Sequence, residues 1–368
     1  MAMTTKYVST AGGGSHDGSS WANAFTFAEM VSDINAGGKA GTIYSVLKGT
    51  YGLSADVTIT GDGSTSSPII IQGCNATPGD LRNAKRNAAG ALDSSNMPVF
   101  SWSPGRLDAS GGDKIVFESV RFTGSPSYYL IQAGDNCKFV NCVVENTSTN
   151  SAASTIGTSG NHIQMVNCDL SGGGTSASYA VNVGHAYAVL RNCRITGNGY
   201  GLACTSSSSC VAVENLILNC PTGGIYVGSG AWCYPDKNTI YACGDGIVYQ
   251  SGSSLAAVAG ENHITDCTGY AVRYNGNTIP KTRFGLRTRD NASGVDDATG
   301  DWDDNCDFFP VTTDAGGAST DFTASGSGDF TLVATAAAVG AGINPYCDIG
   351  AFGAARTSGG GMKGYAAA

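Results

Sequence analysis

Between residues 120 and 266 the chain repeats a short segment in which an apolar residue stands between more polar neighbours. The segments read VRFTG, CVVEN, CDLSG, CRITG, NLILN, NTIYA and NHITD. They begin at Val120, Cys142, Cys168, Cys193, Asn215, Asn238 and Asn262, so successive starts are 22, 26, 25, 22, 23 and 24 residues apart. Their third position is always apolar: Phe122, Val144, Leu170, Ile195, Ile217, Ile240 and Ile264. Alternation of this kind predicts a series of short β-strands.

A second apolar column follows in the stretches GYGLAC, GGIYV, DGIVY and GYAVRY. Its inward residues would be Leu202, Ile225, Ile247 and Val272. A third column, five places after the segment starts, holds Asn198, Cys220, Cys243 and Cys267. One repeat cannot bury such columns alone, but repeats stacked at the strand spacing of about 4.8 Å form a continuous core. The pattern predicts a right-handed parallel β-helix with three short strands per coil.

Composition supports this all-β prediction. Of 368 residues 53 are glycine, and only 13% are charged, which disfavours an α-solenoid. The net charge of −9 disfavours nucleic acid and anionic membranes as partners. There is no apolar run of transmembrane length, and the start MAMTTKYVST has no pattern of a secretion signal, so we expect a protein that folds in the cytoplasm. The 13 cysteines include no CxxC pair and are expected to be reduced, buried thiols.

Segments near both ends carry a resemblance. These are YVSTAGGGSHDGSSWANAFTFAEMV, TIYSVLKGTYGLSADVTI and GSTSSPIIIQG at the start, and DFTLVATAAAVGAG followed by CDIGAF near the end. They resemble the pectate-lyase-like parallel β-helix superfamily, although Thr335 and Ala336 replace the usual Ser-Pro of the last coil. The resemblance implies an N-terminal cap over residues 1–39, with a helix near 25–34. It also implies about ten coils over 40–280, a loop-rich excursion with the last strands over 281–356, and an arm over 357–368.

Many members of this superfamily cleave acidic polysaccharides, with a calcium-binding acidic cluster and a basic residue or with paired carboxylates. The expected motifs Asn-Thr-Asp, Gly-His-Gly, Arg-Ile-Lys and Trp-Ile-Asp-His do not occur in the chain. The best remaining constellation is Glu145, Asp169, Arg191 and Arg194 on neighbouring coils, which could grip a sugar acid. The alternative is a set of solvent-facing ion pairs of little energetic weight. We therefore assign no catalytic, cofactor-binding or metal-binding residue.

Other polar groups are open to two interpretations. His16, His162, His185 and His263 are expected in turns or on the surface. The acidic residues Asp296, Asp297, Asp301, Asp303, Asp304 and Asp307 would suit calcium or form a solvated loop. The basic residues Lys281, Arg283, Arg287 and Arg289 would pair with that loop or with a neighbouring subunit. Tyr226, Tyr234 and Tyr241 would stack on sugars or pack internally.

Three function hypotheses follow. The first is a non-enzymatic structural protein of a bacteriophage virion, a capsid decoration or cement protein or a short spike. We expect it to be a homotrimer on the capsid surface that contacts other capsid proteins and, as a further option, a host glycan. The alternative is a polysaccharide lyase or glycoside hydrolase of the same fold. A weaker third hypothesis is an adhesin that binds glycans without cleaving them. The first hypothesis rests on the missing catalytic motifs and the absence of a recognisable attachment domain, and the second on analogy of fold.

Overall fold

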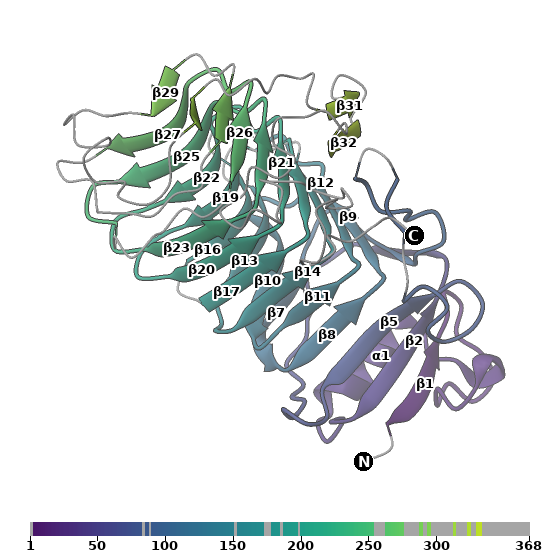
Figure 1. The fold of residues 1–368 in the computed structure, drawn as a ribbon. Helices are drawn as coiled ribbons and strands as arrows, with labels where there is room; N and C mark the ends of the chain where they lie inside the picture. Colours follow the sequence, from purple (N-terminus) through teal and green to yellow (C-terminus); the bar gives the residue numbers. More distant parts are fainter. Residues whose placement is uncertain are drawn as a thin grey trace.

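Three parallel sheets enclose one apolar interior and run along the chain from its N-terminal end (Figure 1). The computed structural model describes, with side chains, residues 3–82, 85–87, 90–150, 153–172, 178–184, 187–197, 199–253 and 262–275. Beyond residue 275 it describes only the backbone of five short strands. Successive strands of the chain enter different sheets, so each coil adds one strand to each sheet.

The described strands make up sheets of nine, ten and eleven strands. The nine-stranded sheet contains β1 (Thr4–Val8), β2 (Thr42–Leu47), β5 (Ile69–Cys74), β8 (Ile115–Glu118), β11 (Lys138–Val140), β14 (Ile163–Val166), β17 (Tyr187–Arg191), β20 (Ser209–Val213) and β23 (Trp232–Asp236). The ten-stranded sheet contains β4 (Val57–Thr58), β7 (Leu107–Asp113), β10 (Tyr129–Asp135), β13 (Ser154–Thr158), β16 (Tyr179–Val183), β19 (Tyr200–Cys204), β22 (Gly223–Val227), β25 (Asp245–Gln250), β27 (Tyr270–Asn275) and β29 (Ser293–Val295).

The eleven-stranded sheet completes each coil. It contains β3 (Thr50–Leu53), β6 (Val99–Trp102), β9 (Arg121–Gly124), β12 (Val143–Asn146), β15 (Asp169–Gly172), β18 (Arg194–Thr196), β21 (Leu216–Leu218), β24 (Thr239–Tyr241), β26 (His263–Thr265), β28 (Arg287–Arg289) and β30 (Thr312–Thr313). A separate antiparallel pair is formed by β31 (Phe322–Ala324) and β32 (Asp329–Leu332). The predicted right-handed parallel β-helix is confirmed, with about nine coils where about ten were expected.

Strand register confirms the first and second apolar columns. In the first, Val144 pairs with Phe122 and Leu170, and Ile217 pairs with Ile195 and Ile240. The second column runs from Leu202 through Ile225 and Ile247 to Val272. Every member is at most 1% exposed, so the stacked side chains are the core of the solenoid.

The bend between the nine- and eleven-stranded sheets explains why asparagine recurs in the repeat. Asn141, Asn167 and Asn192 occupy it with φ of 53°, 54° and 53°, a left-handed conformation that asparagine tolerates. The next residue of the chain points inward. In the later coils that residue is Asn215, Asn238 or Asn262, and the amide groups form a buried ladder: Nδ2 of Asn215 and of Asn238 each donates to Oδ1 of the next asparagine at 2.9 Å. These bonds let polar side chains occupy a dry interior.

The N-terminal end is closed by α1 (Phe27–Asn35), which follows the 3-10 turn η1 (Trp21–Asn23) (Figure 1). A capping box begins the helix, because Thr26 Oγ1 accepts from Glu29 N and Glu29 Oε2 accepts from Thr26 N at 2.7 Å. The Phe27 ring packs on Phe100 at a centroid distance of 4.8 Å, above the first apolar column. The predicted helical cap is thereby confirmed.

The domain boundaries drawn from sequence stay predictions. β1 already pairs in parallel with β2, so residues 4–8 belong to the nine-stranded sheet although they precede the boundary at residue 39. The segments 281–356 and 357–368 lie outside the described residues, apart from the short strands named above. Within the described part of the chain, no helix has the length and apolar character needed to cross a membrane.

Candidate functional site

The constellation predicted from sequence does not form one site. Glu145, on β12, makes an ion pair with Arg121, whose Nη2 lies 2.6 Å from Glu145 Oε2. Arg191 lies on β17 of a different sheet and pairs with Glu214 at 3.3 Å. Arg194 stands beside Asp169 in the strand register, but within the described residues the ion-pair partner of Asp169 is Arg86. The four residues therefore do not converge on a common ligand.

Asp169 has a structural partner that sequence reasoning did not find. The excursion between β5 and β6, residues 75–98, lies on the eleven-stranded sheet and brings Arg86 to Asp169. Arg86 Nε donates to Asn167 Oδ1 at 2.7 Å, and Nη2 donates to the carbonyl of Asn192 at 3.0 Å. The amide of Leu92 donates to Asp169 Oδ2 at 2.8 Å. Both charged side chains are only 10% exposed, so the ion pair holds the excursion on the sheet and does not line an open groove.

The histidines are scattered over the fold. His16 Nδ1 lies 3.0 Å from Glu29 Oε2 at the helical cap, and His162 stands at a bend beside the Tyr187 ring. His263 is fully buried in β26, so the prediction of a turn or surface position is wrong for this residue. It lies within the eleven-stranded sheet and not in a turn, with β24 on one side of it and β28 on the other. His185 lies outside the described residues.

Most of the acidic and basic residues near the C-terminus lie in parts of the chain that the structure does not describe. Asp296, Asp297, Asp301, Asp303, Asp304 and Asp307, together with Lys281 and Arg283, lie outside the described residues. Arg287 and Arg289 belong to β28, for which the backbone alone is described. The predictions of a calcium loop and of a subunit contact therefore remain predictions.

A row of partly exposed tyrosines follows the outer face of the ten-stranded sheet. We name Tyr129, Tyr179, Tyr200 and Tyr226 the tyrosine face. The rings of Tyr179 and Tyr200 stack at 5.7 Å with an angle of 24°, and those of Tyr200 and Tyr226 lie 5.1 Å apart. The Tyr129 hydroxyl accepts a 3.4 Å hydrogen bond from Asn182 Nδ2.

Glycines make room for these rings. A Cβ on Gly157 would come within 2.6 Å of the Tyr129 ring, and one on Gly223 within 3.0 Å of the Tyr200 ring. Burial raises the pKa of the Tyr129, Tyr179 and Tyr200 hydroxyls, so these groups stay protonated at neutral pH. The face thus offers flat apolar surface with hydroxyls along its margin.

Tyr200 of the tyrosine face also borders a hollow of about 300 Å³, which Asp245, Val248, Gln250 and Arg273 help to line. Asp245 Oδ1 accepts from the Tyr270 amide at 2.8 Å, and Asp245 Oδ2 lies 3.2 Å from Arg273 Nη1. The Arg273 guanidinium lies 5.8 Å from the centre of the Tyr270 ring. Its side chain is 44% exposed while that of Asp245 is 12% exposed, so the cation is the accessible partner.

The three tyrosines singled out from sequence lie on three different sheets. Tyr226 belongs to the tyrosine face, whereas Tyr234 lies on β23 with its ring stacked near Trp232, and Tyr241 lies on β24. Sequence reasoning missed Tyr179 and Tyr200. A signal existed, because each stands two places before an inward residue of the second apolar column, Val181 and Leu202.

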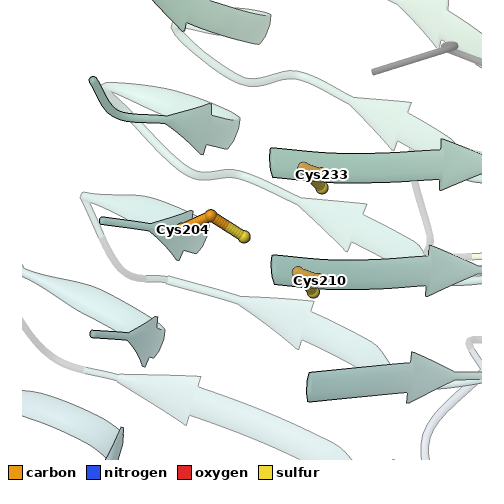
Figure 2. A group of neighbouring side chains, drawn as sticks. All are labelled: Cys204, Cys210 and Cys233. Carbon is orange, nitrogen blue, oxygen red and sulfur yellow. The ribbon is translucent and has the colours of Figure 1, made fainter. Parts of the chain in front are cut away.

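All eleven cysteines in the described part of the chain are free and buried, as expected for reduced thiols. Three of them converge, which sequence reasoning missed. The Sγ atoms of Cys204, Cys210 and Cys233 all lie within 4.8 Å of one another, and Figure 2 shows them at facing strands. Thiol hydrogens of Cys204 and Cys210 can point to Cys233 Sγ, which lowers the pKa of Cys233 to about 5. Burial raises the pKa of Cys204.

Fold and comparisons agree on the class of protein. The chain is a right-handed parallel β-helix, and residues 107–268 match the family model described as "Right handed beta helix region". This match and the structural neighbours agree with the parallel β-helix fold of the chain. A search of curated protein sequences finds no match.

Two solved structures share the architecture. Pectate lyase Pel9A is similar with a TM-score of 0.52 and 14% identity, over 91% of this chain and 88% of that chain. A rhamnogalacturonan lyase is similar with a TM-score of 0.50 and 12% identity, over 73% of this chain and 75% of that chain. At such identities the likeness establishes the fold alone.

Proposed function

We propose that this protein binds an acidic polysaccharide along the tyrosine face, with one sugar carboxylate at Arg273. The observation that carries the proposal is the contact of the Tyr200 ring with those of Tyr179 and Tyr226, together with the place of Tyr200 in the lining of the hollow that also contains Arg273. Stacked phenol rings give apolar contact area to sugar rings, and their hydroxyls offer hydrogen bonds to sugar hydroxyls. A guanidinium matches the planar geometry of a carboxylate.

The hollow can bind an anion through Arg273 even though it also contains the carboxylate of Asp245. Among the described residues, Asp245 is the one hydrogen-bond acceptor of Arg273, and it contacts only Nη1. Since a guanidinium has five N–H donors, the exposed side of Arg273 can serve a ligand carboxylate as well. The two structural neighbours are, by name, lyases of pectate and of rhamnogalacturonan, which supports an acidic polysaccharide as the ligand class.

Binding without cleavage fits the carboxylates better than hydrolysis does. Hydrolysis of a glycoside needs two carboxyl groups on either side of the scissile bond. Glu145, Asp169 and Asp245 are each held by an arginine, so these three candidates serve as ion-pair partners. The alternative proposal of a lyase or hydrolase remains a distinct outcome of the experiment below.

Binding is tested with polygalacturonate, alginate and neutral dextran by isothermal titration calorimetry. Tyr200→Ala and Arg273→Gln are expected to weaken binding of the acidic polymers by about tenfold or more, because each removes roughly 1–2 kcal/mol of contact. Tyr187→Ala is the matched control, since Tyr187 is 40% exposed but lies on the nine-stranded sheet. Equal affinity for all three variants would refute the assignment of the face.

Catalysis is tested on the same polymers by absorbance of unsaturated products and by new reducing ends. We expect neither signal from the wild-type protein. Turnover that disappears in Tyr200→Ala would instead support the lyase or hydrolase proposal and overturn the non-catalytic one.

For the biological setting we propose a bacteriophage particle, in which the chain is a capsid decoration or cement protein or a short spike on the capsid surface, assembled as a homotrimer. Interior apolar columns and asparagine ladders make a stiff rod suited to such a structural role. Co-purification with capsids in a fixed ratio to the major shell protein, and a trimer mass by light scattering, are the expected results. A monomer that never accompanies capsids would contradict this setting.

A further inference from the structure

We propose that Cys204, Cys210 and Cys233 bind a soft metal ion, Zn²⁺ or Cu⁺, inside the solenoid. Their sulfur atoms lie within 4.8 Å of one another, and each residue is 0% exposed. Thiolate sulfur is the ligand that zinc and cuprous ions prefer among protein groups.

The arrangement differs from an ordinary column of stacked cysteines. Cys142, Cys168 and Cys193 stand in the same place on three successive coils. The outer two members of such a row are about 9.6 Å apart, twice the strand spacing, and cannot share an ion. Cys210 and Cys233 are likewise neighbours, on β20 and β23. Cys204, however, faces them from β19 across the interior, which closes the trio into a triangle (Figure 2).

The spacing fits coordination after a small adjustment. Three sulfurs around a zinc ion at about 2.3 Å lie about 3.8 Å from one another in a tetrahedron and about 4.0 Å apart in a plane. With sulfurs no more than 4.8 Å apart, each spacing exceeds that of a metal site by about 1 Å at most. Side-chain rotation alone supplies such a shift.

A second feature of the interior points to the same place. The hydroxyl of Tyr249 is buried and has no hydrogen-bond partner within the described residues. Tyr249 occupies the register position of Cys204 two strands further along the ten-stranded sheet, with Val227 between them, and its ring stacks on Tyr274 at 4.9 Å. A buried hydroxyl without a partner is unusual, and thiolates bound to a metal would accept its hydrogen.

The site would link two successive coils and two sheets. Cys204 ends β19 and Cys210 is the second residue of β20, on either side of the connection 205–208, while Cys233 belongs to the next coil. Because the sulfurs have no access to solvent in the folded chain, the ion must be taken up as the coils close, with the three thiol protons released to water. Metal uptake and folding of these coils are then coupled.

The test is metal content after refolding. Wild-type protein is unfolded in guanidinium chloride with a reductant and a chelator, transferred to metal-free buffer, and refolded with Zn²⁺ or with Cu⁺. Elemental mass spectrometry is expected to find about one ion per chain after gel filtration. Refolding with Co²⁺ provides an independent readout, because thiolate ligation produces sulfur-to-cobalt charge-transfer absorption.

Variants make the result specific. Cys233→Ala and Cys204→Ala should retain less than about a tenth of the wild-type metal and lose the cobalt band. Cys168→Ala is the matched control: it removes an equally buried thiol from a row and should retain the ion. Absence of bound metal in refolded wild type, retention in Cys233→Ala, or a disulfide between Cys210 and Cys233 would overturn the site. The effect of Tyr200→Ala on polysaccharide binding does not depend on any of these three outcomes, so the metal site and the polysaccharide site can fail separately.

Discussion

From the buried contact between Arg86 and Asp169 we predict how much stability the protein loses when the excursion over residues 75–98 is detached from the eleven-stranded sheet. Arg86→Ala removes a guanidinium that is 10% exposed and bonded to Asn167 and to the carbonyls of Cys168 and Asn192. The Asp169 side chain, also 10% exposed, keeps its charge, and the Leu92 amide remains as a hydrogen-bond donor to it. An uncompensated buried charge of this kind costs about 3–5 kcal/mol.

The matched control is Arg121→Ala. Arg121 also pairs with a carboxylate of the same sheet, Glu145, but the two side chains are 35% and 32% exposed. Solvent screens that pair, so its loss should cost less than about 1 kcal/mol. The difference between the variants isolates burial as the cause, because both remove an arginine beside a strand carboxylate.

Two assays measure the effect. Urea unfolding monitored by tryptophan fluorescence gives the free energy of unfolding, and limited proteolysis reports opening of the excursion. Combining Arg86→Ala with Asp169→Asn should restore part of the loss, since the unpaired charge is gone, and the coupling in the double-mutant cycle should exceed about 2 kcal/mol. An Arg86→Ala variant as stable and as protease-resistant as Arg121→Ala would refute the argument.

Two further substitutions test the core and the cap. Ile217→Asp places an unpaired carboxylate in the dry interior and should cost several kcal/mol of stability or prevent folding. The control Val211→Asp, on the outer side of β20, should cost about 1 kcal/mol or less. Similar urea midpoints for the two variants would contradict the strand register. Burial tends to raise the pKa of Asp33, but hydrogen bonds from Lys39 and Tyr44 hold it below its usual 3.8. Asp33 therefore stabilises the folded state fully above pH 3.8, and this contribution is lost as the pH falls further. Asp33→Asn should thus unfold more easily at neutral pH and converge with the wild type in acid, and an unfolding difference independent of pH would contradict this.

The fold was predictable because it depends on a local rule applied many times. Residues such as Leu170 and Ile217 recur in one position of a repeat of 22 to 26 residues, and each occurrence predicts the same inward direction. In the structure these positions pair from one strand to the next. Because each coil contacts only its neighbours, an incorrect prediction for one coil does not change the prediction for the others.

The candidate site was predictable only in part. Tyr179 and Tyr200 occupy the same place in the repeat, so alignment against Val181 and Leu202 could have found them, whereas Tyr226 stands at another place, opposite Ala203. The place of Arg86 had no such signal, since it lies outside the repeat and its partner Asp169 is 83 residues away. A chain that leaves the regular coil can return to any strand of the sheet.

Periodic sequence therefore settles the architecture of this protein, namely inward columns, bends with asparagine and the parallel stack of coils. The tertiary structure alone decides which groups meet across the interior or under the excursion. Cys204 illustrates the division: the strand pattern indicates that it points inward, but only the closed coil brings it to Cys210 and Cys233. The physical reason is that strand direction depends on neighbouring residues, whereas convergence depends on the path of the whole backbone around the solenoid.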